Sequence, residues 1–155
     1  MKTAHEYAVA TVLRETGPAV KLSTPDEVAR YWREHVATGP GFDPEKEHFV
    51  VLLLDVRSRL KGHHLISVGL LNQCLVDARA VFRPAIAANA YSVTLLHNHP
   101  SGNATPSEAD IRITRDLIRA GQILKVEVLD HVVLGQVGDP ERPAGHASLR
   151  ELGYF

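Results

Sequence analysis

The pattern of apolar and polar positions is clearest from residue 47 onward, where a polar stretch gives way to the run EHFVVLLLD. A short, continuous apolar run with polar flanks is typical of a buried strand. The polar turn VRSRLKG and a second apolar run, HLISVGLL, come next, and this arrangement predicts an antiparallel hairpin. A further strand is predicted over YSVTLLHNH, and one or two more over ILKVEVLDHVVLG.

Two segments share a helix-start signature, in which a threonine cap precedes a proline at the first helical position and a glutamate at the third. They predict helices from Pro25 to about Val36 and from Pro106 to about Ala120, the second closed by Gly121. A helix predicted over 77–89 contains Pro84, which must kink it or mark its true start. The remaining predictions are a helix over 3–14, a linker over 38–46, a loop over 136–145 and a docked C-terminal piece, SLRELGYF.

The order of strands and helices predicts an α/β fold in which a sheet is layered with helices. With 155 residues, of which 45% are hydrophobic and 23% charged, the chain suits one compact globular domain. We divide it into an N-terminal helical extension with its linker, residues 1–46, and a main domain, residues 47–155.

Composition narrows the classes of partner and compartment. The net charge is -1 with histidines neutral, so the chain lacks the basic excess of most duplex-binding domains. The single cysteine, Cys74, excludes an intrachain disulfide and is expected to be buried among leucines. Charged residues such as Glu6 and Arg14 interrupt the short apolar pattern at the N-terminus, which fits neither a signal peptide nor a membrane span. We therefore expect a cytoplasmic protein with no membrane partner.

The most specific chemistry lies in HNHPSGNATPSEAD, residues 97–110. Alternate side chains of a strand point the same way, so His97 and His99 share one face. A proline and a glycine then end the strand, and the next helix places Asp110 in its first turns, where it can face the strand end. Two nitrogens and one carboxylate oxygen would converge there, with a fourth position left for water. This is the ligand pattern of a catalytic zinc.

Each of these residues also has an ordinary structural explanation. A histidine on an apolar strand is usually a packed or surface group, and an aspartate near a helix start usually complements the helix dipole. The spacing His-x-His-x10-Asp at a breaking strand end favours a ligand set instead. Ser101 and Asn103 fit simple turn chemistry. Asp130 and His131 are adjacent in a predicted strand and so face opposite ways, which allows only one of them to support the metal from behind.

The motif HNHPSG followed by PSEAD resembles the JAMM motif of the JAB/MPN metalloenzymes, and most specifically the RadC-like branch of that superfamily. The resemblance runs from about residue 47 to the C-terminus, about two thirds of the chain, and includes VGLLN, LDH and SLRELG. It implies a three-layer α/β/α sandwich with a mixed sheet, of the cytidine-deaminase-like type. In that family the two histidines and the aspartate bind zinc, which implies that His97, His99 and Asp110 are ligands of Zn2+.

The resemblance also implies two catalytic residues. The family's motif serine, three residues before the aspartate, helps to hold the tetrahedral intermediate, and here it is Ser107. A glutamate at the start of the first core strand takes a proton from the zinc-bound water, and Glu47 occupies that place, with Glu45 as its nearest competitor. The chemistry is general, because zinc lowers the pKa of its water toward about 7 and a nearby carboxylate can shuttle the proton. Many relatives have an arginine-glutamate pair where this chain has Arg79-Ala80, so one candidate base is missing.

The predicted function is a zinc-dependent hydrolase that cleaves a peptide or isopeptide bond in a peptide or protein substrate; the resemblance supplies the choice of bond. One alternative is a DNA-repair-associated role with DNA-associated partners, including a metal-dependent nuclease, as the name of the RadC family implies. The motif residues of HNH nucleases lie far apart in sequence, unlike those here, and the residues before 47 show no helix-hairpin-helix signature of the longer relatives. Another alternative is a non-catalytic interaction module, as in superfamily members that have lost ligands. Here the predicted ligands are all present.

Overall fold

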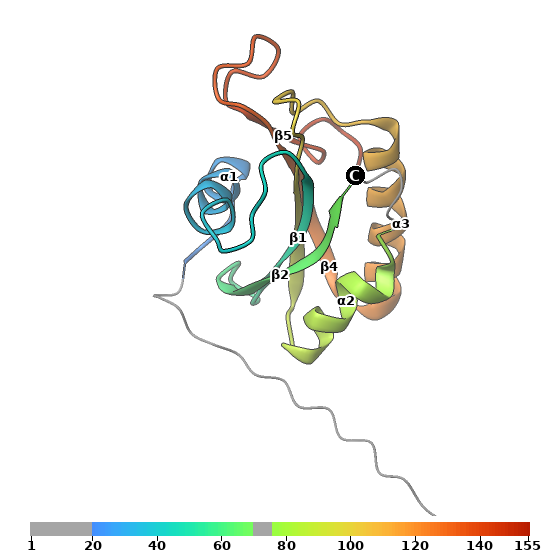
Figure 1. Ribbon diagram of the computed structural model, residues 1–155. Coiled ribbons are helices and arrows are strands. Elements are labelled where there is room, and N and C mark those ends of the chain that lie inside the picture. The colour runs from blue at the N-terminus through green and yellow to red at the C-terminus, as the bar shows by residue number, and fades with distance from the viewer. Residues whose placement is uncertain (1–19, 70–75) are drawn as a thin grey trace, which may run out of the picture.

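The computed structural model describes residues 20–69 and 76–155, which form a mixed sheet layered between helices (Figure 1). The helix predicted over 3–14 and the predicted burial of Cys74 lie outside the described residues. The elements are α1 (Pro25–Tyr31), a π-helical turn η1 (Trp32–Val36), β1 (Glu47–Leu54), β2 (Leu60–Gly69), α2 (Ala78–Ala87), β3 (Ser92–Asn98), α3 (Glu108–Leu124), β4 (Glu127–Leu134) and β5 (His146–Ser148).

The sheet has the strand order β2-β1-β3-β4-β5. β1 pairs antiparallel with both β2 and β3, β3 pairs parallel with β4, and β4 pairs antiparallel with β5. The predicted hairpin is confirmed, but β2 begins at Leu60, earlier than expected, because the Asp55 carboxylate closes a tight turn by accepting from the backbone of Arg57 and Arg59. The segment ILKVEVLDHVVLG contains one strand, β4.

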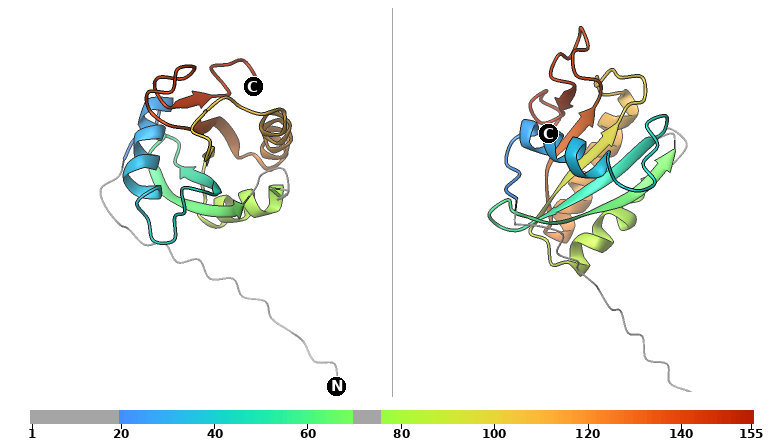
Figure 2. Two further views of the ribbon diagram at one scale, coloured as in Figure 1. Left: turned by 45° about the horizontal axis from the view of Figure 1, so that its top comes forward. Right: turned by 60° about the vertical axis from the view of Figure 1, so that its left-hand side comes forward.

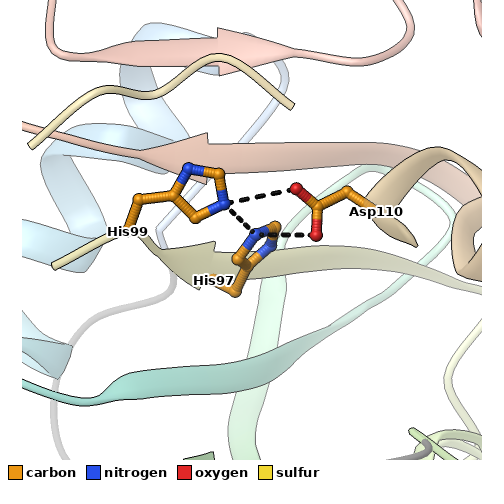
Figure 3. Close-up of side chains that lie close together, drawn as sticks. All are labelled: His97, His99 and Asp110. Atoms are coloured by element: carbon orange, nitrogen blue, oxygen red, sulfur yellow. Dashed lines mark hydrogen bonds and ion pairs between the residues drawn. The ribbon is translucent and has the colours of Figure 1, made fainter. Parts of the chain in front are cut away.

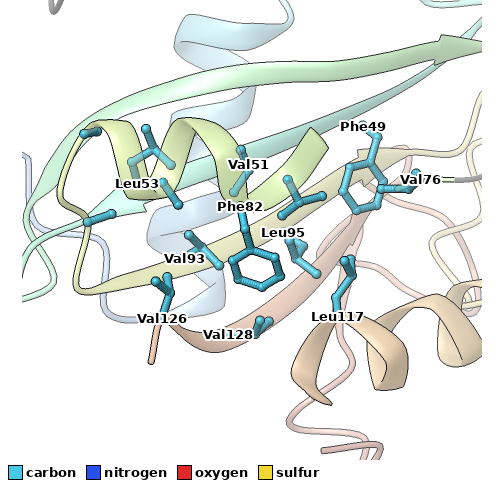
Figure 4. Packing of buried hydrophobic residues seen from close by; sticks show 14 residues of the cluster. Phe49, Val51, Leu53, Val76, Phe82, Val93, Leu95, Leu117, Val126 and Val128 are labelled. Atoms are coloured by element: carbon cyan, nitrogen blue, oxygen red, sulfur yellow. The ribbon is translucent and has the colours of Figure 1, made fainter. Parts of the chain in front are cut away.

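The three layers are confirmed: α1 covers one face of the sheet, and α2 and α3 cover the other (Figure 2). Every residue of β1 after Glu47 is buried, which explains its continuous apolar run. Phe49 and Leu95 face α2 and α3 and pack with Phe82 and Leu117 (Figure 4). The next residues along β1 and β3 face the opposite way and pack against α1 and η1, where Val28, Tyr31 and Trp32 are buried as a helix stripe.

The boundaries of two helices differ from the prediction. The cap of α3 is Ser107 and not Thr105, because the Ser107 side chain accepts from the Asp110 amide while the Asp110 carboxylate accepts from the Ser107 amide. Gly121 does not end α3, which continues to Leu124 and stops at Lys125 in the left-handed conformation. A Cβ at Gly121 would lie 2.5 Å from the Val126 carbonyl oxygen, so this glycine serves close packing.

The start of α2 lies upstream of Pro84, which sits inside that helix. Asp77 caps the helix by accepting from the Arg79 amide. The capping box predicted for the first helix is present at Thr24 and Glu27. Among the described residues, no helix combines the length and the apolar character needed to cross a membrane.

Candidate metal centre

The C-terminal end of β3 supplies the two histidines. His97 is fully buried on the face that α3 covers, and its ring stacks on Phe49 with a centroid separation of 6.0 Å. Asn98, which points the other way, ties this strand end to β1: its Oδ1 accepts from the His48 amide at 2.8 Å, and its Nδ2 donates to the Lys46 carbonyl at 2.9 Å. The position of the histidines therefore follows from strand pairing.

Asp110 occupies the third position of α3, where the capping box holds it. Its Oδ2 accepts from the Ser107 amide at 2.8 Å, and the Ser107 hydroxyl oxygen accepts from the Asp110 amide at 3.1 Å. The side chain is 1% exposed. The start of α3 thus presents a buried carboxylate to the end of β3.

The structure brings the three predicted ligands together (Figure 3). His97 Nε2 lies 3.2 Å from Asp110 Oδ1, and His99 Nε2 lies 3.2 Å from Asp110 Oδ2. The two Nε2 atoms are 3.0 Å apart. Donor atoms at zinc-binding distances from one tetrahedral ion are separated by about 3.3 Å. The spacing of these donors therefore fits a single metal ion.

The Nδ1 atoms of His97 and His99, which point away from the cluster, also have hydrogen-bond partners. His99 Nδ1 donates to the Asn103 carbonyl at 2.8 Å, so the neutral ring carries its lone pair on Nε2. His97 Nδ1 lies 2.8 Å from His131 Nε2, which makes His131, and not Asp130, the residue that supports the cluster from behind. Asp130 has a structural role instead and accepts from the Ser148 hydroxyl at 2.6 Å.

When His97 and His99 are neutral, the lone pairs of their Nε2 atoms and the Asp110 carboxylate oxygens all point toward the centre of the cluster. Two imidazole nitrogens and a buried carboxylate repel one another unless a cation lies between them, either a proton or a metal ion. Two imidazole nitrogens and one carboxylate oxygen form a donor set suited to zinc. The residues present therefore fit a bound divalent metal.

The pKa values follow from this crowding. Burial alone would raise the pKa of Asp110, but hydrogen bonding with His97 and His99 holds it well below its ordinary value. Burial opposes the charge of His99, yet Asp110 and the Asn103 carbonyl raise the pKa of His99 overall. Complete burial, together with the nearby His97, holds the pKa of His131 well below its ordinary value. The centre therefore keeps an ionised carboxylate at neutral pH.

Glu47 lies at the same end of the sheet. β1 and β3 are antiparallel and pair Phe49 with His97, so Glu47 comes level with His99 and shares the face of both histidines. The negative charge of Glu47 contributes to the raised pKa of His99. Glu45 is exposed in the turn before the strand, where its amide donates to Asp43. The register thus favours Glu47 over Glu45 as the carboxylate near the cluster.

Comparison with known proteins agrees with this architecture. The family model described as RadC-like JAB domain matches residues 22–154. The chain belongs to the RadC-like JAB domain family. Its match includes α1 as well as the sheet and the metal-ligand candidates.

Relatives of this RadC-like JAB domain are UPF0758 proteins. One from Caldanaerobacter subterraneus is 36% identical over 155 residues, covering all of this chain and 61% of that protein. One from Staphylococcus haemolyticus is 35% identical over 155 residues, and the match covers 63% of that protein. One from Thermosynechococcus vestitus is 47% identical over 106 residues, and the match covers 68% of this chain and 40% of that protein. The chain thus spans between 40% and 63% of these relatives, whose names state no activity.

A cavity of about 460 Å³ adjoins the candidate metal centre of the RadC-like JAB domain. It reaches His99 and Pro100, and it is walled by Trp32 of η1, Phe42 of the 38–46 linker and Leu134 at the end of β4. His99 is 14% exposed at its side chain, whereas His97 and Asp110 are closed off. The cavity therefore reaches one of the three ligand candidates, but its walls belong to the side of the sheet covered by α1 and η1, whereas His97 faces α3.

Sequence reasoning missed two supporting residues of this centre. Asn103 was assigned to turn chemistry, but its carbonyl orients His99. Thr114 was not predicted as part of the site, although it lies one helical turn after Asp110 and forms hydrogen bonds with both Asp110 and His131. The i, i+4 spacing from the aspartate was the available signal for Thr114. No local signal identified a backbone carbonyl as the partner of His99.

Proposed function

We propose that this RadC-like JAB domain is a zinc-dependent hydrolase that uses water to cleave a peptide or isopeptide bond. The observation that carries the proposal is the buried convergence of two histidine nitrogens and one carboxylate at separations of 3.0 to 3.2 Å. Three protein ligands and an open fourth position are typical of catalytic rather than structural zinc.

In this proposal His97, His99 and Asp110 hold the metal. A bound zinc ion would supply Lewis acidity, which lowers the pKa of a water toward about 7 and polarises a carbonyl group. The ionised Asp110 contributes one negative charge to that site, and the two neutral histidines contribute none. The closed environment of His97 and Asp110 excludes competing water from one side of the cluster.

Glu47 is the proposed general base and acid. Its carboxylate would take a proton from the attacking water and deliver it to the leaving nitrogen, which departs poorly unless it is protonated. Glu47 lies level with His99 in the register of β1 and β3, and this position supports the assignment. Ser107 is the proposed donor to the developing oxyanion, because its oxygen accepts from the Asp110 amide while its own hydrogen remains to be donated.

The ligand set supports a single-metal peptide hydrolase over a two-metal nuclease. Two-metal phosphodiesterases hold a pair of ions about 3.5–4 Å apart, which requires several bridging and flanking carboxylates. Within residues 20–69 and 76–155, the metal-ligand cluster contains one carboxylate, that of Asp110. A peptide or protein substrate is therefore the partner that we propose.

The test combines elemental analysis with substrate screening on the purified protein. We expect about one zinc per chain, lost in His97→Ala and retained in His64→Ala, a matched change of an exposed histidine on β2. Against a panel of peptides and isopeptide-linked conjugates, Glu47→Gln should abolish cleavage with zinc still bound, and Glu45→Gln should not. A protein that takes up no zinc after reconstitution would overturn the proposal, as would equal cleavage by wild type and Glu47→Gln.

A further inference from the structure

A chain of hydrogen bonds runs behind the metal-ligand candidates, from the backbone of Asp110 to the ring of His97. The Thr114 hydroxyl donates to the Asp110 carbonyl at 2.6 Å. The same Thr114 oxygen lies 2.6 Å from His131 Nδ1, and His131 Nε2 lies 2.8 Å from His97 Nδ1. His97, Thr114 and His131 are all fully buried, so water does not compete for these bonds.

The direction of each bond follows from the first one. A carbonyl only accepts, so Thr114 uses its single hydroxyl hydrogen on Asp110. Its oxygen must then accept from His131, which places the hydrogen of His131 on Nδ1 and leaves Nε2 as an acceptor. His97 therefore donates from Nδ1, and its lone pair lies on Nε2, the atom that faces His99 and Asp110.

We propose that Thr114 and His131 are positioning residues that set the tautomer of His97, so that His97 presents a lone pair rather than a hydrogen to the metal centre. This inference deepens the proposed function and rests on it as far as zinc is concerned. The tautomer itself is a property of the metal-free fold. Neither positioning residue touches the ligand-facing atoms of the cluster.

The contrast between the two histidines explains why a relay is needed on one side only. His99 faces the Asn103 carbonyl, which can only accept, so its tautomer is set directly. His97 faces another imidazole, which can either donate or accept. In the reversed tautomer, His131 would donate to His97, and a hydrogen on His97 Nε2 would occupy the metal position. The Thr114 hydroxyl, committed to Asp110, removes that alternative.

The direct test is nitrogen-15 NMR of the imidazole rings in metal-free protein at mildly alkaline pH, where a protonated ring nitrogen and an unprotonated one have well-separated shifts. We expect protonated Nδ1 and unprotonated Nε2 in both His97 and His131. A protonated Nε2 in His131 or in neutral His97 would overturn the relay. This measurement needs no zinc and no substrate, so it decides the relay even if the proposed function fails.

Variants of Thr114 test the consequence for metal binding by competition with a chelator. Thr114→Val removes the hydroxyl at similar volume, and we expect zinc affinity to fall about 10-fold, the lower end of the effect of residues that support metal ligands. Thr114→Ser should restore both the affinity and the His97 tautomer. Thr94→Val is the matched control, because Thr94 is a buried threonine on the opposite face of the same strand as His97.

Two outcomes would contradict the assignment in the variants. Equal zinc affinity in Thr114→Val and wild type would show that the hydroxyl does not act on His97. Equal losses in Thr114→Val and Thr94→Val would show a general packing effect. If Thr114→Val does not fold, Thr114→Ser and the wild-type spectra still decide the question.

Discussion

Zinc should raise the thermal stability of the wild-type chain and should fail to do so after Asp110→Asn. The substitution keeps a carbonyl oxygen that can accept from the Ser107 amide, so the capping box of α3 survives. Loss of a whole cap would cost about 1 kcal/mol, and this cost is avoided, so any loss of stability in the metal-free variant comes from the contacts of the Asp110 carboxylate with His97 and His99. What the substitution removes is the negative charge of the ligand candidate that contacts His97 and His99.

The size of the effect follows from ligand linkage. At free zinc about 100 times its Kd, binding stabilises the fold by about 2.7 kcal/mol. For a domain of this length, that raises Tm by about 5 to 11 °C, at about 2 to 4 °C per kcal/mol. Residues that merely support ligands contribute up to about 100-fold in affinity, so loss of a ligand should cost at least about that much. The remaining stabilisation is then at most about 0.4 kcal/mol, or about 1 to 2 °C.

Differential scanning fluorimetry with and without zinc measures both shifts. Asp116→Asn is the matched control, because Asp116 is an exposed aspartate on the same helix. Its carboxylate pairs with Arg119 at 3.2 Å. It should keep the wild-type zinc response. A zinc shift of equal size in wild type and Asp110→Asn would refute the assignment of Asp110 as a ligand, and so would a loss of the shift in Asp116→Asn.

Two further predictions concern the metal-free fold. Complete burial holds the pKa of His131 well below its ordinary value, so the unfolded chain takes up a proton first and the urea midpoint should fall as the pH drops below 6.5. The raised pKa of His99 offsets part of this loss, so His99→Asn should steepen the fall, whereas a flat urea midpoint below pH 6.5 would contradict the reasoning. Gly121→Ala usually stabilises a helix, but here it should lower the free energy of unfolding by about 1 to 3 kcal/mol, because the new Cβ would lie 2.5 Å from the Val126 carbonyl oxygen. An unchanged urea midpoint in Gly121→Ala would contradict this explanation.

The parts of the fold that local pattern determines were predicted correctly. The strands β1 and β3 could be predicted because their apolar runs are short and bounded by polar residues, and burial on both sheet faces explains those runs. The three ligand candidates were found because a strand alternates with period two and a capped helix follows within a few residues. The α/β/α layering followed from the order of these elements and from the resemblance.

The misplaced boundaries depended on contacts between distant residues. Thr105 and Ser107 both satisfy the rules for a helix cap, and Ser107 is chosen because Asp110 must also face β3. Gly121 resembles a helix end but is needed where α3 passes close to Val126. His131 was one of two adjacent candidates for support of the metal, and only the alignment of β4 with β3 decides between them.

The carboxylate of Asp110 belongs to two structures at once, the start of α3 and the candidate metal centre. The usual capping box has glutamate or glutamine at the third helical position, but the shorter aspartate keeps its two oxygens close to the backbone. One oxygen accepts from Ser107 and faces His99, while the other faces His97. The helix cap therefore orients this candidate ligand in the absence of a metal, which would reduce the freedom lost on binding. The same geometry fixes Thr114 one turn later, so that the start of α3 orients Asp110 directly and His97 through His131.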